Sequence, residues 1–476
     1  MSVPMIMRRL YASDYLIKEK DRKGELPSTK SAYTNFFKFA WPSMAESLLI
    51  SLVGLVDTQM VSGLGSSAVT AVGVTNQPKF LFYAPLFALN VGVTAIVSRR
   101  KGQNDREGAN RCLAQAILLV VVLGALLCGT AIAVAEPLIR FAGGSDAVID
   151  EAVTYYRIIM VGMFFTALGL VINGSHRGTG KTQISMIANV TANLINCLFN
   201  YLLINGHLFF PALGVKGAAI ATLIGNIVSC LISVYTVFFR KNSYLRIKFR
   251  EIFRLDTKLL ALIGNVASGA AVEQVFLRFG FFAYSILVNN LGDAAIATHT
   301  ACMTIVTISF AVGDGLGIAS SALVGQNLGK KRPDLSKLYG KVGQRIGIIV
   351  SVILVLLFTL GANFLVSIFV VEGDPNAEYM LSVGVILLYI LAATSPAQIS
   401  QVVYNGCLRG AGDTKFVALT SLVTIALIRP LTTYVLCYPL GLGLIGAWIS
   451  LLIDQYLRLA FSSIRFIGGK WSKIVI

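Results

Sequence analysis

Twelve long apolar segments divide the chain, and they limit its possible folds more than any other feature. Each reaches the roughly 20 apolar, small or weakly polar residues that an α-helix needs to cross the hydrocarbon core of a bilayer. Charged residues make up only 13% of the 476 residues, about half the share in an ordinary soluble protein. We therefore predict an all-α integral membrane protein with twelve transmembrane helices. These helices are expected at 36–62, 68–98, 109–134, 151–173, 183–204, 215–239, 258–289, 294–325, 342–370, 377–405, 415–438 and 443–465.

Lys and Arg gather in alternate connections between these segments. They are concentrated in 1–38, 99–111, 240–258 and 326–345, whereas the outer connection 136–151 is mostly acidic. Because positive charge marks the cytoplasmic side of membrane proteins, both termini are expected in the cytoplasm and the protein in the cell membrane. This distribution accounts for the net charge of +17 without a nucleic-acid partner.

The chain also repeats itself. The motif Asn173-Gly-Ser-His-Arg-Gly-Thr-Gly-Lys-Thr182 recurs as Asn405-Gly-Cys-Leu-Arg-Gly-Ala-Gly-Asp-Thr414, and Leu64-Gly-Ser-Ser-Ala68 recurs as Leu291-Gly-Asp-Ala-Ala295. Each half holds six helices, an even number, so the halves keep one orientation and should be related by a pseudo-twofold axis along the membrane normal. The expected parts are a cytoplasmic N-terminal tail (1–35), two six-helix lobes (36–239 and 258–465), a basic cytoplasmic linker (240–257) and a cytoplasmic C-terminal tail (466–476). Such paired bundles are typical of secondary transporters that work by alternating access.

Two features of the sequence could suggest nucleotide binding or a metal site, but the evidence for either is weak. Gly180-Lys181-Thr182 resembles the end of a phosphate-binding loop, but Ser175 stands where that motif needs a glycine. We interpret both copies of the repeated motif as surface turns in which glycine ends a helix. The three histidines lie far apart, with His176 in a basic loop and His299 packed in a helix, and the seven cysteines are scattered. We therefore expect no enzyme activity, no metal site and no cofactor, and an ion gradient as the energy source.

Ionisable residues inside the membrane are costly and mark functional or paired sites. The first helix carries Glu46 and Asp57 on one face, three turns apart, beyond Pro42. Pro42 removes a backbone hydrogen bond and favours a kink, unless it only marks the helix start. A bendable helix with a buried acid is a plausible switch, since protonation removes the cost of burying the charge.

A stripe of amides follows one face of the fifth helix. Its members are Asn189, Asn193, Asn196 and Asn200, spaced by four, three and four residues. The amides could bond neighbouring helices, or they could surround Asp57 and serve a cation or a proton network. The stripe is absent from the second half, where the equivalent positions are Ser421, Ile425, Ile428 and Thr432.

The second half keeps one acid in register. Glu273 corresponds to Glu46, while Asp57 corresponds to Tyr284, so the halves are not chemically equivalent. Arg278 follows on the same helix, but a spacing of five aligns it poorly for an ion pair with Glu273.

With these residues in view, the sequence resembles the multidrug and toxic compound extrusion (MATE) family. The motifs lie in both halves and in order, so the resemblance covers nearly the whole membrane region. They are Ala40-Trp-Pro42, Val56-Asp-Thr58, Gly63-Leu-Gly65, Ser98-Arg-Arg-Lys-Gly102, Arg177-Gly-Thr-Gly180, Gly214-Val-Lys-Gly-Ala-Ala-Ile-Ala-Thr222, Val324-Gly-Gln326 and Leu408-Arg-Gly-Ala-Gly-Asp-Thr414.

The resemblance implies an antiporter, driven by H⁺ or Na⁺, that exports organic and often cationic compounds. It assigns cation coupling to Asp57, Asn196, Asn200 and Thr222 in one lobe and to Glu273 in the other, with Pro42 as a hinge. Family members often have Asp at the position of Asn200, and some have Asp at that of Gln398. One acid per lobe favours H⁺ over Na⁺. We expect the transport cavity to involve Glu46, Asn193, Arg278 and Gln398.

Other functions remain open at this stage. A flippase for lipid-linked saccharide precursors shares this architecture, and Arg278 and Arg429 could meet an anionic head group. A membrane-bound transferase would need a cluster of His and acids near one interface, and none is visible. A channel fits poorly with two unequal lobes. We expect a monomer whose partners are a small organic substrate and the lipid bilayer.

Overall fold

The structure is a computed structural model and describes residues 10–208, 210–240, 243–370, 376–474 and 476. Over these residues the chain is helical and contains no β-strand, which confirms the all-α prediction. Twelve helical spans are long and apolar enough to cross a membrane, which confirms their predicted number. They are α3 (Thr29–Ser62), α4 with α5 (Ser66–Val74 and Asn76–Gly102), α6 (Arg106–Ala133), α8 (Ile149–Gly178), α9 (Thr182–Ile204), α10 (Gly214–Phe238), α12 (Thr257–Asn289), α13 (Asp293–Gly329), α14 (Pro333–Leu360), α16 (Ala377–Gly410), α17, η2 and α18 in continuity (Thr414–Ser421, Leu422–Ile428 and Arg429–Cys437), and α19 (Gly443–Gly468).

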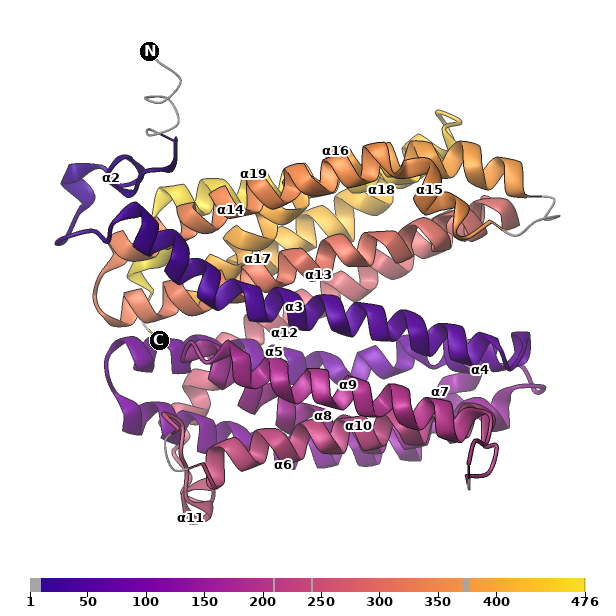
Figure 1. The fold of residues 1–476 in the computed structure, drawn as a ribbon, viewed down its shortest axis with the longest axis horizontal. Helices are drawn as coiled ribbons and strands as arrows, with labels where there is room; N and C mark the ends of the chain where they lie inside the picture. The colour runs from indigo at the N-terminus through magenta and orange to yellow at the C-terminus, as the bar shows by residue number, and fades with distance from the viewer. Residues whose placement is uncertain (1–9, 209, 241–242, 371–375, 475) are drawn as a thin grey trace. The chain divides into compact units, whose positions relative to one another are not determined.

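The chain forms two compact units. Unit 1 contains residues 1–44 and 268–476, and unit 2 contains residues 45–267. Within each unit the long helices run side by side as a bundle (Figure 1). One short helix, α2 (Ser13–Leu16), precedes the long helices, and three others connect them in the chain: α15 (Ala362–Ser367) in unit 1, and α7 (Ala135–Phe141) and α11 (Phe249–Ile252) in unit 2.

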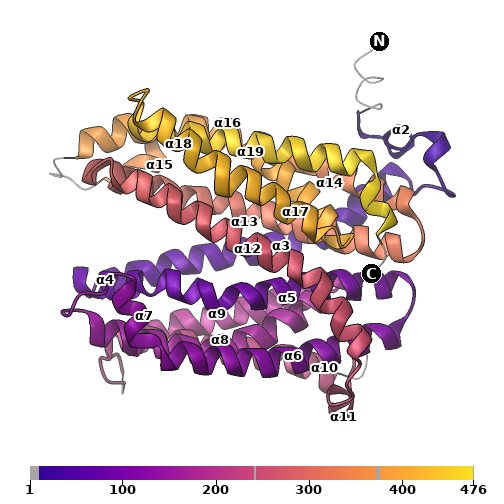
Figure 2. The ribbon, with the colours of Figure 1, turned by 180° about the vertical axis from the view of Figure 1, so that it is seen from behind.

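The first helix of each repeat half is divided between the two units. The first part of α3 belongs to unit 1, because Phe36 and Ala40 are buried in the core of that unit. The first part of α12 belongs to unit 2, because Leu259 and Ile263 are buried there. Figure 2 shows these first turns of α12 beside α11. The compact units therefore differ from the halves of the sequence repeat by the exchange of these two short segments.

Several helices extend past their predicted ends. α3 begins at Thr29 rather than at 36, so Pro42 lies inside the helix and does not mark its start. α14 spans Pro333–Leu360 rather than 342–370, because its charged first turns are helical too. The second apolar segment is two helices that meet at Thr75. A prediction from hydropathy alone assigns charged turns to loops. In α3 and α14 such turns are helical.

The repeated motif makes the same local structure in both units. Gly180 and Gly412 follow α8 and α16 with φ of 86° and 85°, values that glycine adopts without strain. In both copies the next residue closes the helix: the N–H of Lys181 donates to the carbonyl of His176, and that of Asp413 to the carbonyl of Leu408, each at 2.8 Å. The prediction that glycine ends these helices is confirmed.

Two further glycines of the motif let helices approach closely. A Cβ on Gly174 of α8 would collide with Asn90 of α5, and a Cβ on Gly406 of α16 would collide with Gly317 of α13. Asn90 and Gly317 are themselves equivalent positions of the repeat. The duplication therefore preserves a helix–helix contact as well as a sequence motif.

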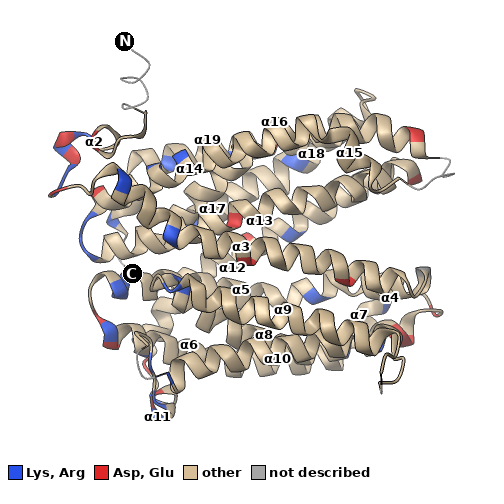
Figure 3. Cartoon of the chain, viewed as in Figure 1, with Lys and Arg blue, Asp and Glu red and all other residues tan. Residues whose placement is uncertain are grey.

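Charged side chains mark the ends of the helices. Figure 3 shows Lys and Arg gathered around α11 in unit 2 and around α2 in unit 1, while most of each bundle carries neither sign. This is the pattern expected of helices embedded in lipid. The placement of both termini in the cytoplasm stays a prediction.

Candidate coupling site

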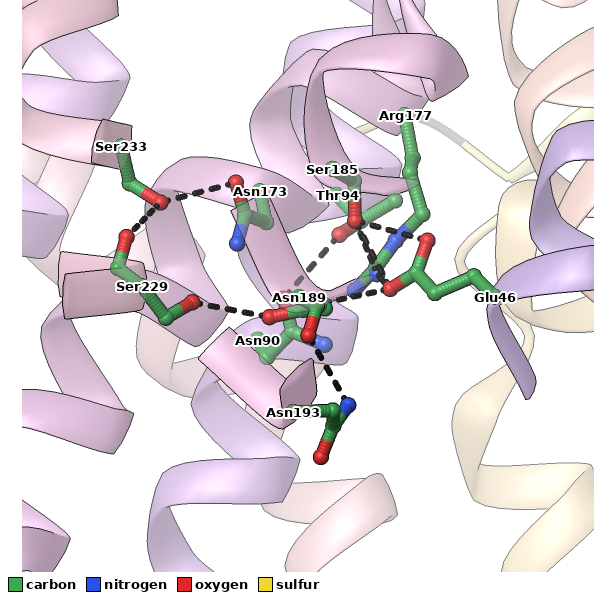
Figure 4. A network of polar contacts seen from close by, with 10 residues as sticks. All are labelled: Glu46, Asn90, Thr94, Asn173, Arg177, Ser185, Asn189, Asn193, Ser229 and Ser233. Atoms are coloured by element: carbon green, nitrogen blue, oxygen red, sulfur yellow. Dashed lines mark hydrogen bonds and ion pairs between the residues drawn. The ribbon is translucent and has the colours of Figure 1, made fainter. Parts of the chain in front are cut away.

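Unit 2 holds a buried carboxylate, Glu46, at the centre of a polar network (Figure 4). Glu46 lies on α3 and is only 4% exposed. It accepts hydrogen bonds from Arg177 Nη1 at 3.1 Å, from Ser185 Oγ at 2.9 and 3.0 Å, and from Asn189 Nδ2 at 2.5 Å. A buried carboxylate needs such donors and a compensating charge, and Glu46 has both.

The network continues into three neighbouring helices. Asn189 of α9 accepts from Ser229 Oγ of α10 at 2.8 Å. Ser233 Oγ, one turn further along α10, donates to Asn173 Oδ1 of α8 at 3.0 Å. Asn193 donates to the backbone carbonyl of Asn189 at 2.9 Å. Glu46 is thus held by a connected set of side chains, and a change in its charge would be felt by α8, α9 and α10.

The expectation that 173–182 forms a surface loop is wrong. α8 continues to Gly178, and both His176 and Arg177 are buried. Arg177 is tolerated there because Glu46 neutralises it. His176 Nε2 lies 2.8 Å from Thr236 Oγ1, so this histidine joins two helices rather than lying in a basic loop.

A second acid of α3, Asp57, lies three turns beyond Glu46. Asn200 Nδ2 donates to Asp57 Oδ1 at 2.6 Å. The Asn196 amide satisfies all its neighbours when its nitrogen faces Asp57: it then donates to both carboxylate oxygens at 3.0 Å and accepts from Thr222 Oγ1 at 3.3 Å. Asn200 Oδ1 is buried and has no partner among the described residues. The structure therefore brings Asp57, Asn196, Asn200 and Thr222 together, while their role in coupling stays a prediction.

The asparagine stripe of α9 divides between the two acids. Asn189 serves Glu46, and Asn196 and Asn200 serve Asp57. The sequence interpretation that the stripe surrounds Asp57 is therefore only half of what the structure shows. The stripe therefore contacts two carboxylates, Glu46 and Asp57, at different positions along α3.

Unit 1 repeats the Glu–Arg pair. Arg409 Nη2 of α16 donates to Glu273 Oε1 of α12 at 2.5 Å. Arg278, considered as a partner of Glu273 from the sequence, lies half-buried on the same helix. Gln398 accepts from Ser309 Oγ at 3.2 Å, and no hydrogen bond joins it to Glu273 within the described part of the chain. Glu273 and Gln398 therefore do not form one hydrogen-bonded site.

Sequence analysis missed the two arginines, Arg177 and Arg409. Both belong to the repeated motif, and their acids, Glu46 and Glu273, are also equivalent in the repeat. That coincidence of an acid and an arginine in both halves was the available signal. It was overlooked because the motif was assigned to surface turns.

Unit 1 also contains a buried pair that has no counterpart among the described residues of unit 2. Arg429, at the start of α18, donates to Asp454 of α19, and both are almost fully buried. The Arg429 guanidinium lies 5.0 Å from the ring centroid of Phe281 and 5.9 Å from that of Tyr284, the residue equivalent to Asp57. The π-helical turn before Arg429 is explained by Pro430, which lacks the N–H that a regular helix would use.

The remaining candidates have structural partners. His299 Nδ1 accepts from Trp448 Nε1 at 3.2 Å, consistent with a histidine packed in a helix. The seven cysteines are free, and five of them are buried. Across the described residues, no three side chains of His, Cys, Asp or Glu lie close enough to hold a metal ion.

Comparisons with known proteins place this fold. The sequence model of the MatE family matches residues 42–202 and 270–435. A Thermotoga maritima protein named probable multidrug resistance protein NorM is 26% identical over 473 residues, covering 98% of this chain and 97% of the relative. Solved MATE structures described as being in the bent and in the straight conformation superpose with TM-scores of 0.82 and 0.84, at 22% and 23% identity. Each comparison covers 92% of this chain, and 96% and 97% of the respective solved chains. The chain therefore belongs to the MATE family, and it is a multi-pass membrane transporter rather than an enzyme.

Proposed function

We propose that the protein is a cation-coupled antiporter that exports organic, often cationic compounds by alternating access of its two lobes. The observation that carries this proposal is the Asp57 cluster, an acid inside a membrane helix held by side chains that can respond to its charge. The names of relatives such as probable multidrug resistance protein NorM support export as the direction and drugs as the substrate class.

The groups around Asp57 favour H⁺ over Na⁺ as the coupling ion. Asn200 Nδ2 and the Asn196 nitrogen point at the carboxylate as donors. These nitrogen donors cannot bind Na⁺, which needs several oxygen atoms. Besides the carboxylate, the cluster offers the buried Asn200 Oδ1, which has no hydrogen-bond partner among the described residues and which alone would not complete a shell of oxygens around Na⁺. A proton would remove the negative charge and weaken the hold of both amides on Asp57. The contact between α3 and α9 would then loosen without a metal-like coordination shell.

Pro42 gives this change a way to affect the whole transporter. It lies inside α3 and has no N–H to donate to the carbonyl four residues earlier, so the helix is weakened there. The division between the two units falls two residues later, after Met44. Bending at this place would alter how the Asp57 half of α3 follows its first half. Solved relatives in a bent and a straight conformation support a fold that adopts more than one state.

The flippase alternative is less well supported. It relies on interior arginines that are free to meet an anionic head group. Of the two arginines that favoured it, Arg429 is bonded to Asp454, while Arg278 lies half-buried on α12. Arg409, a third interior arginine, is bonded to Glu273. The charges of Arg429 and Arg409 are compensated within the protein.

Transport in proteoliposomes tests the proposal. Efflux of an organic cation would be driven in turn by an imposed H⁺ gradient and an imposed Na⁺ gradient, in the wild type and in Asp57→Asn. We expect H⁺-driven efflux in the wild type and its loss in the variant, because Asn cannot exchange a proton at this site. Asp146→Asn is the matched control: this acid is 89% exposed and lies in a connection, paired with Arg140. Undiminished proton-coupled efflux in Asp57→Asn would refute the assignment, and a strict requirement for Na⁺ would refute the choice of ion.

A further inference from the structure

Residues of the N-terminal tail enclose a basic cavity on unit 1. The cavity has a volume of about 590 Å³ and is lined by tail residues 15–18, 20 and 21 and by residues of α14, α16 and α19. Leu16 and Ile17 of the tail are buried in the core of the unit. We call this cavity the tail pocket. It lies far from the Asp57 cluster in the chain and belongs to the other unit.

Five cations line the tail pocket, with one acid among them. Lys18 and Lys20 come from the tail, and Lys337, Lys341 and Arg345 come from α14. The last three are spaced four residues apart, which places them on one face of the helix, where like charges repel. The acid is Asp21, whose carboxylate lies 3.7 Å from Lys337 Nζ.

Backbone contacts explain how the tail is held, but they do not neutralise this charge. Lys341 Nζ donates to the carbonyl of Leu16 at 2.6 Å, and Arg345 Nε donates to that of Leu10 at 3.0 Å. A carbonyl fixes the position of a cation without cancelling its charge. The pocket therefore keeps a strong attraction for an anion.

Two further features of the pocket indicate the chemical class of the anion that it binds. Gln344 also lines the pocket, and its Oε1 is buried without a hydrogen-bond partner among the described residues. This acceptor can take a hydrogen bond from a donor on the ligand, such as a hydroxyl group. The remaining wall is apolar and includes Leu16, Ile17 and Phe466. The ligand should thus combine a phosphate, a hydroxyl group and an apolar part.

We propose that the tail pocket binds the headgroup of an anionic phospholipid that carries a hydroxyl, such as phosphatidylglycerol. The phosphate lies among Lys18, Lys337 and Lys341, and a headgroup hydroxyl donates to Gln344. Because Lys18 belongs to the tail and Lys341 also donates to the carbonyl of Leu16, the bound lipid ties this part of the tail to α14. This inference is independent of the coupling ion and of the transported substrate.

Lipid retention by the full-length chain tests the proposal. The protein would be placed in phosphatidylcholine nanodiscs that contain a minor fraction of phosphatidylglycerol, and the lipids that remain bound would be counted by native mass spectrometry. We expect preferential retention of phosphatidylglycerol, reduced about fivefold for each cation removed in Lys18→Gln and Lys337→Gln. These lysines form no bond to the tail backbone among those described, so the variants should fold.

Matched variants separate a specific pocket from general attraction to charge. Lys248→Gln is the control, since Lys248 lines a different cavity, of about 620 Å³ in unit 2, together with Arg246 and Glu251. It should retain phosphatidylglycerol as the wild type does. Gln344→Met should abolish the preference for phosphatidylglycerol over phosphatidic acid, whose headgroup has no glycerol hydroxyl.

Three results would overturn the proposal. The first is equal retention of phosphatidylglycerol and phosphatidylcholine by the wild type. The second is unchanged retention in the double variant Lys18→Gln/Lys337→Gln, or an equal loss in Lys248→Gln. The third is binding of soluble glycerol phosphate in pure phosphatidylcholine without retention of phosphatidylglycerol, which would identify a free phosphate ester as the ligand.

Discussion

The two units build the same ion pair from equivalent positions, Glu46 with Arg177 in unit 2 and Glu273 with Arg409 in unit 1. In both, an acid on the first helix of the repeat meets an arginine near the end of the fourth. Glycines of the same motif bring that fourth helix against its neighbour. Since pair and packing recur together, we regard them as the frame that the duplication preserved.

The residues around this shared Glu–Arg pair differ between the two units. Glu46 also receives Ser185 and Asn189, and Asp57 follows it three turns later with its own amides. In unit 1 the position of Asp57 is taken by Tyr284, and Ser421 stands where unit 2 has Asn189. The cluster of an acid with several amides is therefore found in unit 2, whereas the membrane acids of unit 1, Glu273, Asp314 and Asp454, lie near arginines. The stabilising charge pairs are more numerous in unit 1, where Arg429 and Asp454 add a further buried pair.

The largest effect is expected from that extra pair. Arg429→Met should lower the free energy of unfolding by about 3–5 kcal/mol, because it removes the hydrogen-bonded cation of the buried Asp454 and leaves only Arg458, whose Nε is 4.0 Å from the carboxylate. The double variant Arg429→Met/Asp454→Leu removes this pair but leaves the buried Arg458 without its acid, so it should recover only part of the loss. Thermal unfolding in lipid nanodiscs measures both. A single variant as stable as the double variant would show that the pair is not the stabilising element.

The second largest effect is expected when the Glu46–Arg177 pair of unit 2 is removed. Glu46→Gln should cost about 3 kcal/mol, since Arg177 keeps its charge in a buried position, while Ser185 and Asn189 keep a polar partner. Ser185→Ala is the matched control and should cost about 1–2 kcal/mol, because its hydroxyl donates to Glu46 and also accepts from Arg177 Nη1 at 2.8 Å. If the control were as damaging as Glu46→Gln, the hydroxyl rather than the charge pair would hold this centre.

The same substitution in unit 1 should cost less. In Glu273→Gln the arginine left behind, Arg409, has a side chain that is 31% exposed, so it can be solvated in part. We expect a loss of about 1–2 kcal/mol. Proton-coupled efflux should persist in this variant if unit 2 alone carries coupling. Loss of proton-coupled efflux in a folded Glu273→Gln variant would assign coupling to Glu273. Unit 1, rather than unit 2, would then carry the coupling site.

Much of this arrangement could be predicted from the sequence for physical reasons. The twelve helices follow from the length of apolar segments, and the repeat follows from identical residues at a constant offset. The spacing of the amide stripe places Asn196 and Asn200 on one helical face, and the resemblance to the MATE family assigns them, with Thr222, to the site of Asp57. These signals are local, or arise from one residue type placed where it is costly.

The errors arose where two charges cancel across helices. Arg177 and the first turns of α14 were assigned to loops, since a hydropathy pattern counts each charge as exposed. Arg177 is buried only because Glu46, far away in sequence, compensates it. The assignment of the first parts of α3 and α12 to the opposite units has a different cause. It depends on how side chains pack, which the composition of the sequence does not show.

The smallest expected effect tests whether the duplicated frame is energetically the same in both units. Gly180→Ala and Gly412→Ala each force a side chain into the left-handed backbone region, at a cost of about 1 kcal/mol. The new Cβ at position 412 would also lie 2.9 Å from Ile476 Cγ2, a methyl group of a stiff β-branched side chain, so Ile476 must shift. The loss of unfolding free energy, measured in the same nanodiscs, should therefore be larger in Gly412→Ala than in Gly180→Ala, by about 1 kcal/mol. Equal losses would contradict the expected clash, and a much larger difference would mean that the two helix ends share a geometry without sharing its energetic role.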